Sequence, residues 1–206
     1  GAAATDSSAT AIGAQSVASQ LDATAIGTSS AAIGGSSTAT GSNSAAVGDG
    51  STSNGAYAIA SALHATAIGA QSTASGYDST ATGYGSVASD HDATANGADA
   101  EAEGAYSSVF GSESFASGEY SSAFGAGSNA TGTLATATGA QSFASGEVST
   151  ATGGSAYATG DHATATGGSS TASGDNTTAT GYGSVASGED GTATGAFAEA
   201  TGNNST

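Results

Sequence analysis

The sequence contains no cysteine, proline, methionine or tryptophan, and it contains neither lysine nor arginine. Without cysteine, the chain has no disulfide framework and no thiol chemistry. Its 17 acidic residues give a net charge of −17. Because contacts to phosphates depend on lysine and arginine, nucleic acids and anionic membrane surfaces are excluded as partners. No apolar run approaches the length that spans a bilayer, so we expect no membrane insertion.

Glycine, by contrast, is abundant and recurs at a fixed interval. From Gly13 to Gly202 every seventh residue is glycine, except at Gln20, Ala62 and Asp90. Alanine stands two residues before nearly all of these positions, and another very small residue stands two residues before the alanine. The repeated unit therefore reads (Ser/Ala)-x-Ala-x-Gly-x-x, and such a short, strict period is typical of solenoid proteins.

Small residues at alternate positions predict a strand, because successive side chains of a strand point to opposite faces. The glycine and the two residues after it supply a corner, since glycine takes positive φ without steric cost. Two units then close a coil of 14 residues, and stacked coils give two parallel sheets. We predict an all-β parallel β-solenoid of about 14–15 coils, a single β-roll repeat domain over residues 1–206. Its core would consist of methyl groups and backbone.

The strands that end at Gly13, Gly27 and every fourteenth residue thereafter expose an uncharged face. Threonine is a good strand residue, so one interpretation is a solvated sheet. A second is a homotypic interface, in which exposed apolar side chains pack against other copies of the chain. The residues assigned to this interface are Ile12, Thr24, Ile26, Thr66, Ile68, Phe110 and Phe124.

A third interpretation of the same face is ice binding. Pairs of the form Thr-x-Thr make a regular two-column grid, and this face resembles those of insect and grass ice-binding solenoids. The residues assigned to it are Thr136, Thr138, Thr150, Thr152, Thr164, Thr166, Thr178, Thr180, Thr192 and Thr194.

The corner that follows the other set of strands collects most of the acidic residues and all three histidines. Stacked carboxylates could attract Ca²⁺ through hard oxygen ligands. We expect no cofactor, because no recognisable calcium loop is present, and the interpretation we favour is solvated charges that oppose sideways aggregation. The acidic residues are Asp22, Asp49, Asp78, Asp92, Glu119, Glu147, Asp161, Asp175, Glu189 and Asp190, and the histidines are His64, His91 and His162. Because no catalytic constellation is identifiable among them, we expect that the protein is not an enzyme.

Two segments resemble a known family. Residues 65–76 (ATAIGAQSTASG) and 184–188 (SVASG) are similar to the head repeats of trimeric autotransporter adhesins, the YadA-like haemagglutinin repeats. The resemblance covers essentially the whole chain. It implies a left-handed parallel β-roll, a homotrimer, display at a bacterial surface, and binding to host matrix, other cells or surfaces. It also implies that strands of the Ala-Ile-Gly type lie near the trimer axis, which would place the five apolar residues of the homotypic interface there.

The chain also departs from that family. It shows no neck, no heptad stalk and no C-terminal membrane barrel, and it lacks the basic residues that such heads usually carry. Uncapped coil ends would present unpaired backbone groups, which favours head-to-tail stacking of copies into a filament. We therefore expect an extracellular or surface-displayed, self-associating β-roll that serves as an adhesive or structural fibre component. The alternative is an ice-binding protein.

Overall fold

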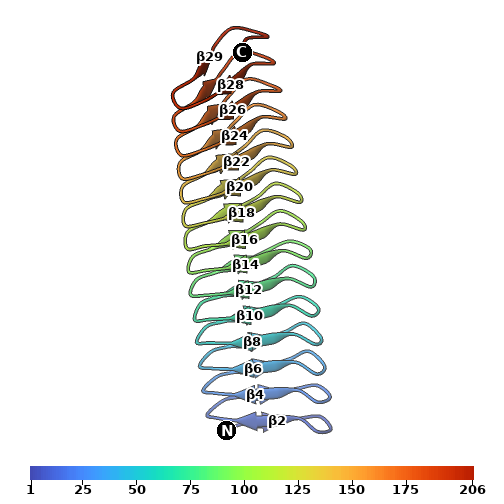
Figure 1. Ribbon diagram of the computed structural model, residues 1–206. Helices are drawn as coiled ribbons and strands as arrows, with labels where there is room; N and C mark the ends of the chain where they lie inside the picture. The colour runs from blue at the N-terminus through green and yellow to red at the C-terminus, as the bar shows by residue number, and fades with distance from the viewer. The chain divides into compact units, whose positions relative to one another are not determined.

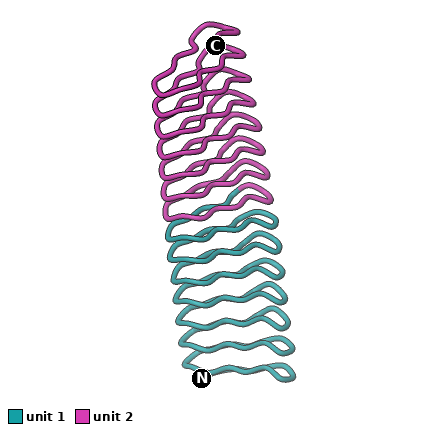
Figure 2. The backbone as a smooth tube through the Cα atoms, in the orientation of Figure 1, with its two compact units in different colours: residues 1–103 teal, residues 104–206 magenta.

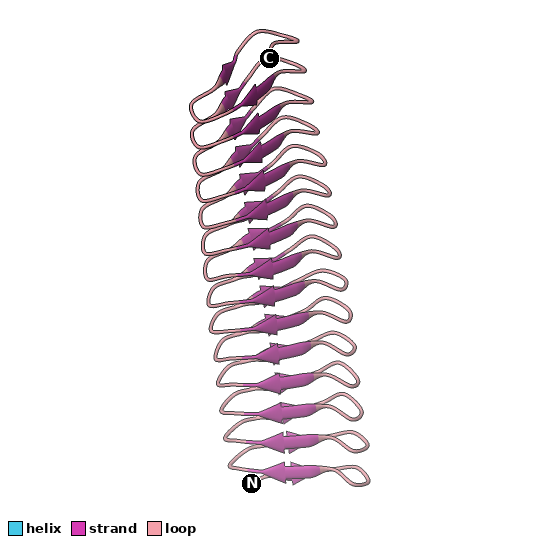
Figure 3. Cartoon of the chain, viewed as in Figure 1, coloured by secondary structure: helices cyan, strands magenta, loops and turns pink.

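The computed structural model describes residues 1–206 and contains strands joined by turns, with no helix (Figure 3). Consequently, no helix is long and apolar enough to cross a membrane. The chain divides into two compact units, unit 1 with residues 1–103 and unit 2 with residues 104–206 (Figure 2). The single domain over residues 1–206 stays a prediction.

Unit 1 contains two sheets, one of odd-numbered and one of even-numbered strands (Figure 1). The odd-numbered strands, in their order in the sheet, are β1 (Ala3–Ala4), β3 (Val17–Ala18), β5 (Ala31–Ala32), β7 (Ala45–Ala46), β9 (Ile59–Ala60), β11 (Thr73–Ala74), β13 (Val87–Ala88) and β15 (Glu101–Ala102). The even-numbered strands are β2 (Thr10–Ile12), β4 (Thr24–Ile26), β6 (Thr38–Thr40), β8 (Thr52–Asn54), β10 (Thr66–Ile68), β12 (Thr80–Thr82) and β14 (Thr94–Asn96).

Unit 2 repeats this arrangement. Its odd-numbered strands are β17 (Phe115–Ala116), β19 (Asn129–Ala130), β21 (Phe143–Ala144), β23 (Tyr157–Ala158), β25 (Thr171–Ala172), β27 (Val185–Ala186) and β29 (Glu199–Ala200). Its even-numbered strands are β16 (Ser108–Phe110), β18 (Ser122–Phe124), β20 (Thr136–Thr138), β22 (Thr150–Thr152), β24 (Thr164–Thr166), β26 (Thr178–Thr180) and β28 (Thr192–Thr194).

In both units each strand pairs in parallel with the strand of the next coil, in a register of 14 residues. Thr66 of β10 lies opposite Thr80 of β12, and Val87 of β13 lies opposite Glu101 of β15. This confirms the predicted parallel β-solenoid with two sheets and a 14-residue coil. The strands are shorter than the five-residue stretch (Ser/Ala)-x-Ala-x-Gly of the repeated unit, with three residues in β10 and two in β13. They end early because the flanking small residues already belong to the corners.

The two corners of each coil are β-turns that differ in how they use glycine. We call the turn after each even-numbered strand the A corner, residues 13–16 and their equivalents every 14 residues. We call the turn after each odd-numbered strand the B corner, residues 20–23 and their equivalents. The A-corner glycine has positive φ, for example +129° at Gly167. The B-corner glycine, such as Gly174, lies outside that region, and only its closeness to the next coil favours glycine.

At both corners, the third residue of the turn has left-handed backbone geometry, usually without being glycine. Asp22, His64 and Val148 all have φ between 54° and 56°. The backbone explains this, because the N–H of the third residue donates to a carbonyl of the preceding coil, as from Val148 to Thr133 O at 2.9 Å. The prediction that glycine supplies the positive φ is therefore right for the first A-corner residue and wrong for the first B-corner residue.

The core of the coils is as small as the sequence predicts. Buried apolar residues are almost all alanine, and the largest fully buried side chain is Val109. Inward serines of the A corner donate to the carbonyl of the corner glycine, as Ser72 Oγ does to Gly69 O at 2.8 Å. Some B-corner serines, such as Ser51, bury a hydroxyl with no partner. The large apolar side chains therefore lie on the outside.

Candidate interaction surface

In each unit, the outward side chains of the even-numbered strands form a face, here called the even-strand face, that carries no charged residue. Each strand contributes its first and third residues, because the middle residue points into the core. The first residue is half-buried along most of the face, as at Thr24 and Thr66. The third residue is more exposed, and it is here that the large apolar side chains occur. This is the face that the sequence singled out.

The structure brings some of the predicted interface residues together and separates others. In unit 1, Ile12 lies opposite Ile26 in the β2–β4 pair. Ile68, 42% exposed, stands between Asn54 and Thr82 and has no isoleucine neighbour in its column. The apolar column of unit 1 is therefore interrupted.

In unit 2, the predicted aromatic residues of this face form a stacked pair. The rings of Phe110 and Phe124 lie 5.3 Å apart between centroids, with 7° between their planes. Both side chains remain exposed to solvent. A stacked and exposed aromatic pair presents a flat apolar surface, which suits contact with another apolar surface.

The ten threonines of the ice-binding interpretation lie on the even-strand face of unit 2. From β20 to β28 they stand in two columns with unbroken pairing, Thr136 opposite Thr150 and so on to Thr192. Neighbouring coils in such a sheet are about 4.8 Å apart, and alternate residues of one strand are about 7 Å apart. The regular grid is present, while its binding of ice stays a prediction.

The opposite face of unit 1 carries exposed apolar residues that the sequence analysis did not single out. Val17 of β3 and Ile59 of β9 are outward residues and are exposed. The structure adds Ile33 and Val47, which follow β5 and β7 and are also exposed. Their backbone N–H groups still pair with the next coil, so their side chains continue the outward column. The signal was available, because the residue before each B-corner glycine continues the strand alternation.

The acidic residues and histidines line the B corners as predicted, and several of them make specific contacts. Asp161 N–H donates to Asp175 Oδ1 at 3.1 Å, and Gly35 N–H donates to Asp49 Oδ1 at 2.8 Å. Each carboxylate thus accepts a corner N–H of the preceding coil. No three His, Cys, Asp or Glu side chains are grouped so that they could hold a metal ion.

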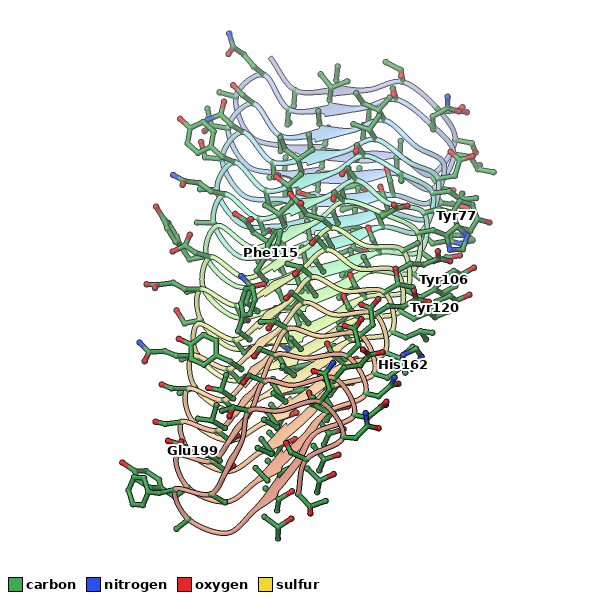
Figure 4. All side chains as sticks on the ribbon, turned by 90° about the horizontal axis from the view of Figure 1, so that it is seen from above. Tyr77, Tyr106, Phe115, Tyr120, His162 and Glu199 are labelled. Carbon is green, nitrogen blue, oxygen red and sulfur yellow. The ribbon has the colours of Figure 1, made fainter.

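Aromatic rings stack along the same corners. In unit 1, Tyr77 lies 5.2 Å from the ring of His91, and His64 Nδ1 lies 3.0 Å from Asp78 Oδ1. In unit 2, the rings of Tyr106 and Tyr120 are 4.8 Å apart and nearly parallel, and both project outward (Figure 4). Exposed stacked rings make these B corners amphipathic, because carboxylates occupy the same edge.

Comparison with known proteins gives a consistent result. The family model described as "YadA head domain repeat (2 copies)" matches residues 4–30, 27–51, 39–61, 46–72, 60–86, 74–100, 88–114, 102–128, 130–156, 158–184 and 186–206. Among solved structures, the collagen-binding domain of the Yersinia adhesin YadA is 26% identical. That match covers 65% of this chain and 59% of the other, with a TM-score of 0.32. No curated protein matches the chain significantly.

Proposed function

The chain belongs to the family of YadA head domain repeats, and we propose that it is a non-enzymatic adhesin head at a bacterial surface that assembles from several copies of itself. The family is one of adhesin domains. The number of copies, the interface between them, the location and the binding partner are all part of what we propose. Three copies is the number that the resemblance to trimeric autotransporter adhesins implies.

The main support for self-association is that the large apolar side chains lie on the outside of the coils and the small ones inside. The coils bury alanine and serine, while isoleucine, phenylalanine, tyrosine and leucine side chains stand exposed. Exposed apolar residues in rows mark interaction surfaces, because their burial releases water and contributes about 25 cal/mol per Å² of apolar area. A chain with so small a core gains much of its available hydrophobic stabilisation only by assembling.

The absence of lysine and arginine selects the face. A carboxylate buried between copies of this chain would find no lysine or arginine to pair with, and an unpaired buried charge is strongly destabilising. The odd-numbered strands carry Glu101 and Glu199, with Glu103 just after β15. The even-strand face carries no charge along either unit. We therefore propose that copies meet through this face, with Ile12, Ile26, Ile68, Phe110 and Phe124 in the contact.

The proposed partner is an extracellular matrix protein. The related solved structure is a collagen-binding domain, and matrix binding is what the resemblance implies. The net charge of −17 favours partners with basic surfaces, since opposite charges raise the rate of encounter.

A matched pair of isoleucines tests the assembly. Ile68 on the even-strand face and Ile59 on the opposite face are 42% and 41% exposed and belong to the adjacent strands β10 and β9. We expect Ile68→Asp to weaken assembly by about 3 kcal/mol or more, because it buries an unpaired carboxylate. That is at least about a hundredfold in the dissociation constant. Ile59→Asp should assemble as the wild type does.

Sedimentation velocity gives the mass of each variant, and circular dichroism shows that each is folded. A trimeric wild type, a dissociated Ile68→Asp variant and an unaffected Ile59→Asp variant support the proposal. A monomeric wild type, or dissociation caused by Ile59→Asp alone, would overturn it. Electron microscopy of the same samples distinguishes discrete rods from head-to-tail filaments.

A further inference from the structure

A hollow interrupts the A corners of unit 2 where Gly127 stands. Its volume is about 270 Å³, and it is lined by Ser112, Glu113, Ala126, Gly127, Ala140 and Gln141 from three successive coils. Gly127 occupies the third position of its corner with φ of 64°. A Cβ atom placed there would touch only Gln141 Cγ, at 3.7 Å. The hollow is therefore the space that a corner side chain would otherwise fill.

Comparison with equivalent corners shows that glycine alone does not make such a hollow. Gly85 and Gly183 hold the same corner position with φ of 63° and 62°. The Cβ site of Gly85 is occupied by the carboxylate of Asp99, and that of Gly183 lies 3.0 Å from the ring of Phe197. At Gly127 the next coil supplies Gln141, whose side chain stands clear. Of the three sites, only the one at Gly127 remains open.

The lining of the hollow matches a primary ammonium group on an alkyl stem. Ala126 and Ala140 supply methyl groups, while Glu113 and Gln141 stand two coils apart, roughly 10 Å. An ammonium group has three donors and no acceptor, so it can bond the Glu113 carboxylate at one side of the hollow. The stem would lie over the methyl groups while the head stays polar.

Two features favour a cation over other ligands. Glu113 makes no ion pair within the chain, which has no lysine or arginine to offer. A single carboxylate is too few for a bound metal ion, which needs several oxygen ligands. The volume lies just below the range for small-molecule pockets, roughly 300 Å³ and above, so it suits a side chain better than a cofactor.

We propose that this hollow, here called the Gly127 notch, binds a lysine side chain of a partner protein. That the lysine belongs to a protein rests on the proposed adhesin function, whereas binding of the ammonium-bearing side chain does not. The net charge of −17 raises the local concentration of basic partners, and the notch then provides a specific contact.

The probe is Nα-acetyl-lysine methylamide, titrated at physiological salt into the full chain while amide resonances are followed by NMR. We expect saturable shifts confined to Ala126, Gly127, Ala140 and Gln141. Gly127→Gln should abolish them, because glutamine fills the notch. The backbone accepts glutamine there, since Gln15, Gln71 and Gln141 hold the equivalent position with φ of 58° to 64°.

Two carboxylate variants form a matched pair. Glu113→Gln should weaken binding about three- to fivefold, the effect of losing one solvent-exposed charge pair. Asp99→Asn removes a charge from the equivalent corner position in unit 1, where the Asp99 side chain itself occupies the space over Gly85, and should leave the affinity unchanged. The norleucine analogue, which lacks the ammonium group, should not produce the shifts.

The absence of saturable shifts, equal binding by Gly127→Gln, or equal binding of the norleucine analogue would each overturn the notch proposal. The same experiments distinguish failure of the notch proposal from failure of the proposed assembly. A trimer that binds no lysine analogue refutes the notch and leaves the assembly intact. A monomer that binds it refutes the assembly and leaves the notch intact.

Discussion

Replacing one glycine from each corner type by alanine should separate two constraints that the sequence pattern combines. Gly167 begins an A corner and Gly174 begins the next B corner. An added Cβ would lie 2.6 Å from Gly181 O in the first case and 2.8 Å from Gly188 O in the second. The steric conflicts are therefore similar. Only Gly167 also has positive φ, at +129°.

The magnitude follows from these two terms. Forcing a methyl group against the backbone of the next coil costs about 1–3 kcal/mol at either site. Holding alanine in a sparsely populated backbone region adds about 1–3 kcal/mol at Gly167 alone. Both variants recover about 0.4–1 kcal/mol because alanine restricts the unfolded chain. We expect Gly167→Ala to lower the free energy of unfolding by about 1–3 kcal/mol more than Gly174→Ala does.

Urea unfolding followed by circular dichroism measures both free energies, and amide exchange locates the damaged coil. Variation among the repeats of this chain agrees with the expected order. From Gly13 to Gly202, glycine is replaced at three B corners, by Gln20, Ala62 and Asp90, and at no A corner. Equal destabilisation of the two variants, or a larger effect at Gly174, would refute the assignment of the difference to backbone conformation.

Two further predictions concern buried hydroxyls and corner strain. Ser72→Ala should lower the free energy of unfolding by about 1 kcal/mol, because Ser72 Oγ donates a hydrogen bond to Gly69 O. Ser51→Ala should leave it unchanged, because Ser51 Oγ has no hydrogen-bond partner. Equal losses of the two variants in urea unfolding would contradict this. Val148→Asn should stabilise the chain by about 1 kcal/mol, because a β-branched residue at φ of 55° is strained and Asn176 holds the equivalent position at 56°. An unchanged or lower melting temperature for that variant would contradict the strain at Val148.

The corners show where sequence reasoning stopped. The seven-residue interval placed the corners, since glycine marks all of those from Gly13 to Gly202 except the ones at Gln20, Ala62 and Asp90. It did not show which residue takes the left-handed conformation. Val148 and Leu134 are poor choices by intrinsic preference, yet both adopt it. Their N–H groups bond to carbonyls of the preceding coil, at 2.9 Å in each case. Pairing between coils, which no local pattern reports, overrides the preference of the residue.

The candidate surfaces divide in the same way. The uncharged face was predictable, because strand alternation assigns each outward residue to a side. The stacking of Phe110 on Phe124 and the separation of Ile68 from other isoleucines also follow from the 14-residue register. The Gly127 notch does not, because the sequence shows that Asp99, Gln141 and Phe197 follow Gly85, Gly127 and Gly183 by one coil but not how their side chains are oriented. Whether the space over each glycine is filled depends on the identity and the conformation of the side chain that the next coil sends toward it.

The sequence by itself therefore determined the coil, the two parallel sheets, the small core and the charge-free face, because a strict period of glycine and alanine leaves one periodic way to pair the backbone. Only the tertiary structure decided which corner residues are strained, which buried hydroxyls lack partners and where the surface is hollow. These properties depend on contacts between residues 14 positions apart, where side-chain conformation in one coil sets the space left in its neighbour.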